Sequence, residues 1–372
     1  MSTTVALVMN SSNVAAANNT TFRYNFIQGS FAVSEGSEIC ISSIVIPYSW
    51  FNVNAATYNN AVFGYTFPMC AQFASATISG TTLNVPAMIN GTIRIGSTLT
   101  GGTVLANTTV ISQSSGTTGG IGVYVVSQSQ TSTASGSIQY VPYQVSLPNG
   151  FYQVEDLNNY LQSYFISQGQ YLVNASGQNV YFISLVTDVT YYSNQIICPV
   201  LPTTLGVLTN PANLGLPLTP TTAQFTVLSS YPAFGSLIGY AIGSYPSTPN
   251  STSYNILGGG ITPNLTPVNS IIVRCNLVSN NVGTPSDIMT SFPINSTFGS
   301  NINFAPNYEQ WVGISTGRYS SITLTLQDQN FNGIQANDVN VLITILIRQP
   351  KRKVEEKSPS LISMSGSAKP IF

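Results

Sequence analysis

Residues 38–46 read EICISSIVI and are followed by Pro47. The run is rich in β-branched and apolar side chains, and proline cannot donate the backbone hydrogen bond that a strand ladder needs. We therefore predict a strand that is buried on both faces for part of its length. Residues 338–347, DVNVLITILI, have the same character near the other end of the chain. Both runs have the length of strands, and the chain contains no apolar run of 18 residues or more, as a membrane-spanning helix would need.

Strand-like runs recur between these two. Phe22–Phe26 alternates apolar and polar residues, as a strand with one buried face does. Clusters of Pro, Gly and Asn separate the runs, as turns require. This number of strands with long loops fits an all-β, antiparallel double-sheet jelly roll. Further predicted strands are Ala61–Phe67, Tyr143–Leu147, Asn179–Leu185, Tyr191–Cys198, Gln224–Leu228, Ser270–Leu277 and Ser321–Leu326.

One segment, Val154–Phe165, has the apolar spacing of a helix instead. Glu155 and Asp156 would lie in its first turn, where the helix dipole favours negative charge. Adjacent helical residues point in different directions, so this pair is better explained by the dipole than by acid–base catalysis. We predict one surface helix of about three turns.

Residues 74–140 have a different composition from their surroundings. They hold a single charge, Arg94, and many Gly, Ser and Thr residues between short alternating pieces. We predict a small β module inserted into a loop of the main domain, because loops tolerate insertions. A disordered linker is the alternative, but the regular apolar alternation argues against it. The predicted domains are thus a jelly roll at 1–73 and 141–348, the insert at 74–140, and an extended tail at 349–372.

Charge is scarce and unevenly placed. Charged residues make up 6% of the chain, and histidine is absent, which excludes His-dependent catalysis and His-ligated metal sites. Residues 1–347 carry four basic and nine acidic groups, whereas residues 348–372 carry six basic and two acidic groups. A body with so little charge suits a chain that is packed against its neighbours, since a free monomer usually stays soluble through charge. We expect no signal peptide, because no apolar segment follows an early basic residue.

The charged tail is the candidate docking segment. It could contact packaged nucleic acid or an inner membrane, since Lys and Arg clusters bind phosphates. Glu355 and Glu356 interrupt the basic block, which favours docking on a neighbouring protein instead. The candidate docking residues are Arg348, Lys351, Arg352, Lys353 and Lys357.

The cysteines and tryptophans give weaker signals. The four cysteines form no CxxC motif, so we expect reduced thiols, with no metal site and no cofactor. Trp50 and Trp311 are candidate core anchors or interface aromatics, and core packing is the favoured interpretation. The cysteines are Cys40, Cys70, Cys198 and Cys275.

Several phrases, taken in order, resemble a known family. They include TFRYNF (21–26), EICISSIVIPYSWFNV (38–53), VSLPNGFYQVEDLNNYLQSYF (145–165), SIIVRCNLVSN (270–280) and TFGSNINFAPNYEQWVGI (297–314). This order is similar to the single jelly-roll penton, or capsid vertex, proteins of large icosahedral double-stranded DNA viruses, the algal viruses and their relatives among them. The resemblance implies five copies at each vertex and no catalysis. It also implies a place in the virion after synthesis in the host cytoplasm.

Three classes of function follow for comparison. The first is a structural capsid protein that forms homopentamers, carries the insert outward and docks its tail on neighbouring major and minor capsid proteins. The second is a virion spike or fibre module that binds a host receptor or glycan through the insert and Tyr-rich loops. The third is an enzyme such as a glycosidase, which needs two carboxylates about 5–9.5 Å apart. No acidic pair in the body is compelling, so we expect no enzyme.

Overall fold

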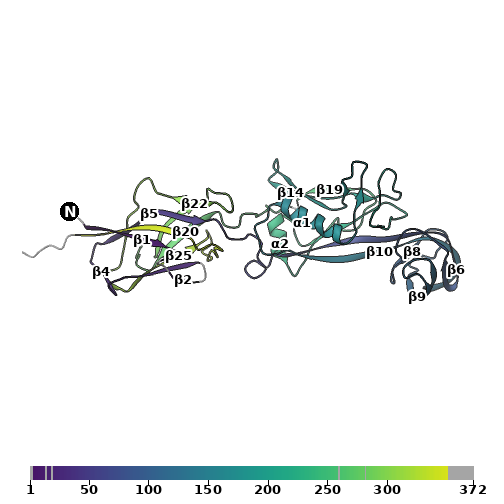
Figure 1. Cartoon of the computed structure of the whole chain (residues 1–372), viewed down its shortest axis with the longest axis horizontal. Helices are drawn as coiled ribbons and strands as arrows, with labels where there is room; N and C mark the ends of the chain where they lie inside the picture. Colours follow the sequence, from purple (N-terminus) through teal and green to yellow (C-terminus); the bar gives the residue numbers. More distant parts are fainter. Residues whose placement is uncertain (1–2, 13–14, 18–19, 259, 281, 351–372) are drawn as a thin grey trace, which may run out of the picture. The chain divides into compact units, whose positions relative to one another are not determined.

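The computed structural model describes residues 3–12, 15–17, 20–258, 260–280 and 282–350, and the chain divides into two compact units (Figure 1). Unit 1 comprises Met1–Trp50 and Val268–Phe372, and unit 2 comprises Phe51–Pro267. Both are built almost entirely from antiparallel strands, with two helices among the described residues. The predicted all-β class is confirmed.

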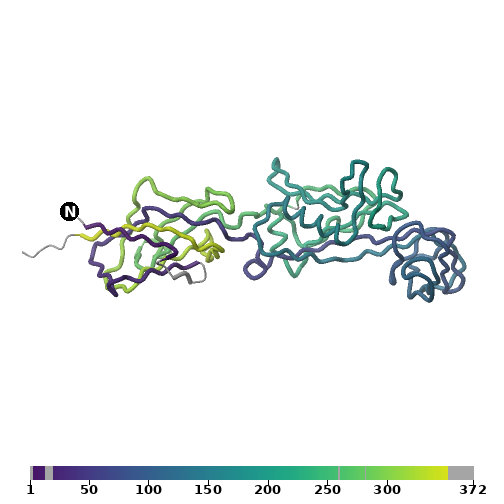
Figure 2. Tube along the Cα trace, viewed as in Figure 1, coloured from purple at the N-terminus to yellow at the C-terminus, as the bar shows by residue number. Residues whose placement is uncertain are grey.

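Unit 1 joins the two ends of the chain, so its purple and yellow segments lie side by side in Figure 2. Four short strands, β2 (Ala15–Ala17), β4 (Phe31–Val33), β23 (Val312–Gly313) and β24 (Gly317–Tyr319), accompany its main strands. Its eight main strands are β1 (Thr3–Asn10), β3 (Thr21–Asn25), β5 (Glu38–Pro47), β20 (Ser270–Cys275), β21 (Ile288–Pro293), β22 (Asn301–Phe304), β25 (Ser321–Gln327) and β26 (Leu342–Gln349).

The pairing of these eight strands is that of a jelly roll. Counted along the chain, the first pairs with the eighth, the second with the seventh, the third with the sixth, and the fourth with the fifth. The resulting sheets have the orders β1-β26-β5-β22 and β2-β3-β25-β20-β21. A long antiparallel ribbon that folds over on itself gives this interleaved order. All of unit 2 is inserted in the chain between the third and fourth strands, β5 and β20.

Burial along β5 follows the sequence prediction. Ile39, Cys40 and Ile41 are buried in succession, so this stretch faces the interior on both sides. The register between β5 and β26 shifts just after this stretch, between the pairs Ile345↔Ile41 and Thr344↔Ser43. Strand β1 was not predicted, although it pairs with β26 in unbroken register from Thr3↔Gln349 to Asn10↔Leu342.

Unit 2 is organised around a long hairpin, β6 (Val62–Val85) and β10 (Gly122–Ser146), which pair from Val62↔Ser146 to Val85↔Gly122 with two register shifts. Helix α1 (Val154–Ser167) confirms the predicted helix, and α2 (Pro232–Ile238) is a second, shorter one. The remaining strands are β7 (Ala87–Gly91), β8 (Thr98–Thr100), β9 (Val110–Gly116), β11 (Leu172–Val173), β12 (Asn179–Val180), β13 (Ser184–Asp188), β14 (Ser193–Cys198), β15 (Val200–Leu201), β16 (Thr221–Thr222), β17 (Gln224–Val227), β18 (Gly243–Tyr245) and β19 (Tyr254–Leu257).

Two hydrophobic clusters line this hairpin. The first, which we call the aromatic core, includes Phe63, Tyr65, Phe67 and Phe165, and the second is smaller and extends from Ala71 to Ala134. The predicted junctions at 73/74 and 140/141 fall within β6 and β10, where the strands continue without a loop. The sequence has strong β character on both sides of each junction, which explains why the β6–β10 ladder continues across both junctions. That residues 74–140 act as a separate module stays a prediction.

Candidate functional site

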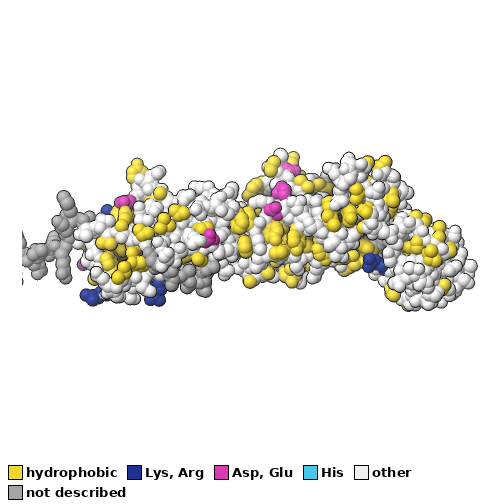
Figure 3. Space-filling view, viewed as in Figure 1, with side chains coloured by type: hydrophobic (Ala, Val, Ile, Leu, Met, Phe, Trp, Pro, Cys, Tyr) yellow, Lys and Arg dark blue, Asp and Glu magenta, His cyan; other side chains and the backbone are white. Residues whose placement is uncertain are grey.

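Charged side chains are sparse on the face of the molecule shown in Figure 3, and unit 1 contains two ion pairs among its described residues. Arg348, the first predicted docking residue, lies in β26 and donates from Nε to Glu38 Oε2 on the neighbouring strand β5. Its guanidinium also lies over the Trp311 ring, 4.2 Å from the ring centroid. Arg348 is therefore held by the body through an ion pair and a cation–π contact. The other predicted docking residues, Lys351, Arg352, Lys353 and Lys357, lie outside the described residues.

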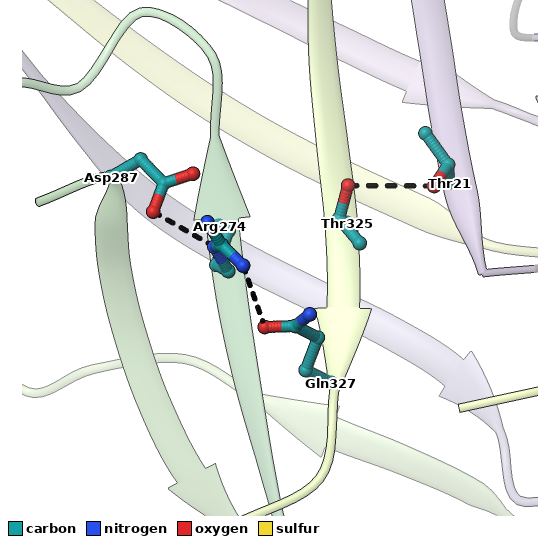
Figure 4. A network of polar contacts seen from close by, with 5 residues as sticks. All are labelled: Thr21, Arg274, Asp287, Thr325 and Gln327. Carbon is teal, nitrogen blue, oxygen red and sulfur yellow. Dashed lines mark hydrogen bonds and ion pairs between the residues drawn. The ribbon is translucent and has the colours of Figure 1, made fainter. Parts of the chain in front are cut away.

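A second polar network crosses the other sheet of unit 1 (Figure 4). Arg274 on β20 donates from Nε to Asp287 Oδ1 at 2.8 Å and from Nη1 to Gln327 Oε1 at 3.2 Å. The hydroxyls of Thr21 and Thr325 lie 3.4 Å apart on the neighbouring strands β3 and β25. The network thus links side chains across adjacent strands, which supports their register.

One end of unit 1 is where the tail begins. Gln349 ends β26, and its side-chain amide donates to the carbonyl oxygen of Ala32 at 2.7 Å. Phe31, the residue before Ala32, lines a hollow of about 150 Å³ together with Phe26. The two rings stack with 5.3 Å between their centroids. Ile27 on the rim of this hollow is 93% exposed. The chain leaves unit 1 after Trp50, which follows the end of β5. It returns at Val268, which precedes the start of β20.

Unit 2 has an exposed aromatic tip at the β13–β14 turn. Tyr191 and Tyr192 are 68% and 74% exposed, and Val189 beside them is also exposed. Asp188 shapes the turn, because its Oδ1 accepts a hydrogen bond from the backbone N–H of Thr190 at 3.0 Å. A cavity of about 210 Å³ opens here, and its lining includes Thr187, Asp188, Tyr192, Asn194, Pro263 and Leu265. The sequence signal is the TYYS run (190–193) at the start of the predicted strand Tyr191–Cys198, and it was not assigned to a site.

Three of the acidic side chains have structural partners. Asp156 Oδ2 accepts from the backbone N–H of Gln153, which completes a capping box at α1. Asp328 Oδ1 accepts from the backbone N–H groups of Asn330 and Asn332 in a turn. Glu155 Oε1 accepts from the Thr187 hydroxyl at 3.1 Å. Within the described part of the chain, no three Cys, Asp or Glu side chains gather as metal ligands would.

All four cysteines are buried and free. Desolvation raises the pKa of Cys40 to about 11, and it raises the pKa values of Cys70, Cys198 and Cys275 to about 12. Because the thiolate is the reactive and metal-binding form, these thiols are inert at neutral pH. They fill space in the two interiors.

The two tryptophans differ in their surroundings. Trp50 is 4% exposed and packs against Tyr48 at 4.5 Å between ring centroids, which confirms the predicted core role. Trp311 is only half-buried, since one face of its ring lies under the Arg348 guanidinium. Its prediction as a core anchor was therefore wrong, because the sequence does not show that a cation from the last strand covers the ring.

Comparison with known proteins gives structural matches but no sequence match. No family model matches the chain, and no curated protein matches it. Among solved structures, the crystal structure of the selenomethionine-labelled mavirus penton protein matches with a TM-score of 0.34 and 6% sequence identity. The match covers 93% of this chain and 91% of the penton chain. Among the described residues, no helix has the length and apolarity needed to cross a membrane.

Proposed function

We propose that this protein is a structural component of an icosahedral virus shell and that five copies form a vertex. The observation that carries the proposal is the strand pairing of unit 1, in which eight main strands interleave as a jelly roll. Jelly rolls serve as viral capsid domains, as lectins and as cupins. The absence of histidine from the sequence removes the His-ligated metal chemistry that one of these roles would use.

The distribution of charge supports assembly over catalysis. The two ion pairs of the described residues, Arg274–Asp287 and Arg348–Glu38, both lie in unit 1, and the remaining surface carries few charges. Burying such a surface against a neighbour costs little desolvation. In a ring each subunit presents two unlike faces that contact the next copy on either side. A jelly roll with few charged side chains suits this arrangement.

The rest of the chain has subsidiary roles in this proposal. Residues 74–140 would face outward from the shell, at the far end of the β6–β10 hairpin from its first pair, Val62↔Ser146. The block Lys351–Lys357 would dock on neighbouring major and minor capsid proteins. Since Arg348 is already paired with Glu38, it would anchor the start of the tail to the body and leave the contact with the partner to the lysines and Arg352.

The test is the oligomeric state of the full chain. We expect mass photometry at physiological salt to show a species of five subunits, and cryo-electron microscopy to show a closed ring. Antibody labelling of intact particles should mark the fivefold vertices and leave the faces unlabelled. A protein that stays monomeric at micromolar concentration, or labelling spread over the faces, would contradict the vertex role. A trimer would favour a spike.

A second candidate function has one observation in its favour. The aromatic tip of unit 2 combines exposed Tyr191 and Tyr192 with a cavity bordered by Asp188 and Asn194. Aromatic faces beside carboxylate and amide groups suit a neutral sugar, so a module that binds a host glycan or receptor is the alternative. Glycan-array binding that is lost in Tyr192→Ala would support it. Tyr308→Ala is the control, because Tyr308 is also largely exposed but lies in unit 1.

A further inference from the structure

The edge strand β1 is the least protected sheet edge of unit 1. Its sequence, TTVALVMN, contains no charge and no proline, and its pairing with β26 shows no register shift. Among the described strands it pairs only with β26. Long, regular and uncharged edges invite another strand to pair with them, and natural proteins usually protect such edges.

The other edges of unit 1 carry such protection. In the first sheet, the opposite edge strand β22 has only four residues. In the second sheet, one edge is the three-residue β2, and the other is β21, which ends at Pro293 and has a register shift against β20. Short strands, proline and bulges are the usual devices against added strands. Strand β1 has eight residues and none of these devices.

The side chains at the start of β1 also face solvent. Thr3, Thr4, Val5 and Ala6 are all exposed, and Val5 is 42% exposed although it is a large apolar residue. The stretch from Thr3 to Leu7 can therefore accept a neighbour along its backbone and present apolar contacts to it. β-Strand addition uses this combination of main-chain hydrogen bonds and side-chain contacts.

The tail supplies a segment of matching chemistry. After the basic block Lys351–Lys357, the sequence continues as SPSLISMSGSA (358–368), which has no charge. Leu361, Ile362 and Met364 give it apolar side chains. An uncharged segment suits an uncharged edge, because neither side must lose the hydration of a charged group when they meet.

The chain's own tail starts in the wrong direction to reach its own β1. In the sheet order β1-β26-β5, the contacts of Gln349 and Pro350, at the end of β26, are with residues that precede β5 in the chain. The Gln349 side chain donates to the carbonyl oxygen of Ala32 in β4, and Pro350 lies against Gly36, just before β5, 3.6 Å from where a Cβ at Gly36 would be. Pairing within one chain would require the tail to turn back around the end of β26.

We propose that residues Ser360–Ser365 of one copy add as an antiparallel strand to Thr3–Leu7 of a second copy. Antiparallel pairing is somewhat more stable per residue than parallel pairing. Donation of a tail from each copy to the next is a heterologous contact, which closes into a ring when the rotation between copies permits. The inference requires only that two copies of the chain meet, so it can fail while the capsid role holds, and the reverse is also true.

Disulfide cross-linking between two separate full-length variants tests the exchange. One variant carries Val5→Cys, and the other carries Ile362→Cys. The native cysteines are buried and inert, so they leave the background low. After mixing and mild oxidation we expect a covalent dimer that neither variant forms alone. Leu361→Cys and Met364→Cys replace Ile362→Cys in parallel mixtures, so that the register need not be known.

Two controls make the result decisive. Val186→Cys has the same exposure as Val5→Cys but lies in unit 2, and it should give no cross-link with the tail variants. A chain that carries both Val5→Cys and Ile362→Cys distinguishes pairing within one copy from pairing between copies. Cross-links that form only within that double variant, or no cross-link in any mixture, would overturn the proposal.

A charge on the edge provides an independent measurement. Val5→Lys places a cation on an exposed position, so the fold should be retained. The unit 1 transition in a thermal melt of the full chain can verify this. Because a charged edge resists strand addition, we expect self-association in analytical ultracentrifugation to weaken by about tenfold or more. Deletion of residues 358–372 should weaken it to a similar extent. Unchanged association in both variants would contradict the exchange.

Discussion

Both units have an antiparallel β interior, but different kinds of side chain fill it. In unit 1, β26 turns Ile343, Ile345 and Ile347 inward, so aliphatic side chains fill most of the space between the two sheets. In unit 2, Phe63 stacks on Phe225 at 5.3 Å, and Tyr65 meets Phe165 edge-on at 5.0 Å between ring centroids. A two-sheet sandwich has a uniform gap of about 10 Å that branched aliphatic residues fill well. A helix laid on a long hairpin leaves irregular space, and large rings occupy it.

The units also differ in how polar groups stabilise them. Both ion pairs of the described residues are in unit 1. Unit 2 instead buries tyrosine hydroxyls: Tyr65 donates to Gln170 Oε1 at 2.8 Å, and the hydroxyl of Tyr240 both donates to Asn194 O and accepts from the backbone N–H of Ile196. The interior of unit 2 therefore depends on neutral side chains staying neutral. The units should respond differently to mutation, to pH and to salt.

The largest difference is expected from Phe165→Ala. Phe165 is fully buried in the aromatic core and contacts Tyr65 and Phe67. Loss of a buried phenylalanine costs about 3–5 kcal/mol, from lost burial and from the cavity that remains. Differential scanning calorimetry should show the transition of unit 2 at a much lower temperature, with the transition of unit 1 unchanged.

A neighbouring substitution serves as the control for that experiment. Ile166→Ala removes an apolar side chain from the same helix, but Ile166 is exposed and should change stability by less than about 0.5 kcal/mol. If Phe165→Ala shifted both transitions together, the two units would unfold as one, and the comparison between their interiors would lose its basis.

Alkaline pH should separate the units next. Desolvation raises the pKa values of Tyr65 and Tyr240 far above their usual 10.0, and both residues lie in unit 2. Because the folded-state pKa exceeds the unfolded one, the stabilisation is complete below about pH 10 and is lost as the pH rises above it. Each tyrosine then costs about 1.4 kcal/mol per pH unit. We expect urea unfolding at pH 11 to destabilise unit 2 more than unit 1.

The cysteines act as an internal reference for this titration. Each unit contains two buried thiols with raised pKa values, Cys40 and Cys275 in unit 1 and Cys70 and Cys198 in unit 2. Above about pH 9 these thiols ionise in the unfolded chain before they do in the folded one, which should weaken both units to a similar degree. Equal losses in the two units across pH 10–11 would show that the tyrosines do not contribute as described.

The fold class could be predicted from local sequence patterns. Features that depend on pairing between distant segments could not. The apolar stripe that defines α1 and the β-branched run that defines β5 each lie within a short stretch of sequence, so both were predicted. The division after Trp50 was not, because nothing in a strand's own sequence states which sheet it joins. Strand β1 was missed because its alternation is weak and its partner β26 is more than 300 residues away.

The same limit applied to the candidate site. The basic tail was recognised from composition, since no lysine precedes Lys351. The assignment of Arg348 to a strand, to Glu38 and to the Trp311 ring depends on segments that meet only in the folded sheet. The aromatic tip at Tyr191 and Tyr192 looked like part of a strand, because exposure cannot be inferred from a tyrosine's identity.

Arg348→Met should give the smallest effect and sharpen the electrostatic side of the comparison. Methionine keeps much of the apolar stem but loses the ion pair with Glu38 and the contact with the Trp311 ring. Partly exposed pairs of this kind contribute about 0.5–1 kcal/mol, and salt screens them. In low salt we expect the variant to lower the stability of unit 1 by that amount, and in 1 M NaCl the difference from the wild type should shrink. Unit 2, which has no ion pair among its described residues, should show no such salt dependence. A loss that persists unchanged at high salt would mean that Arg348 acts through packing on Trp311, and Glu38→Gln in the same background would then have no further effect.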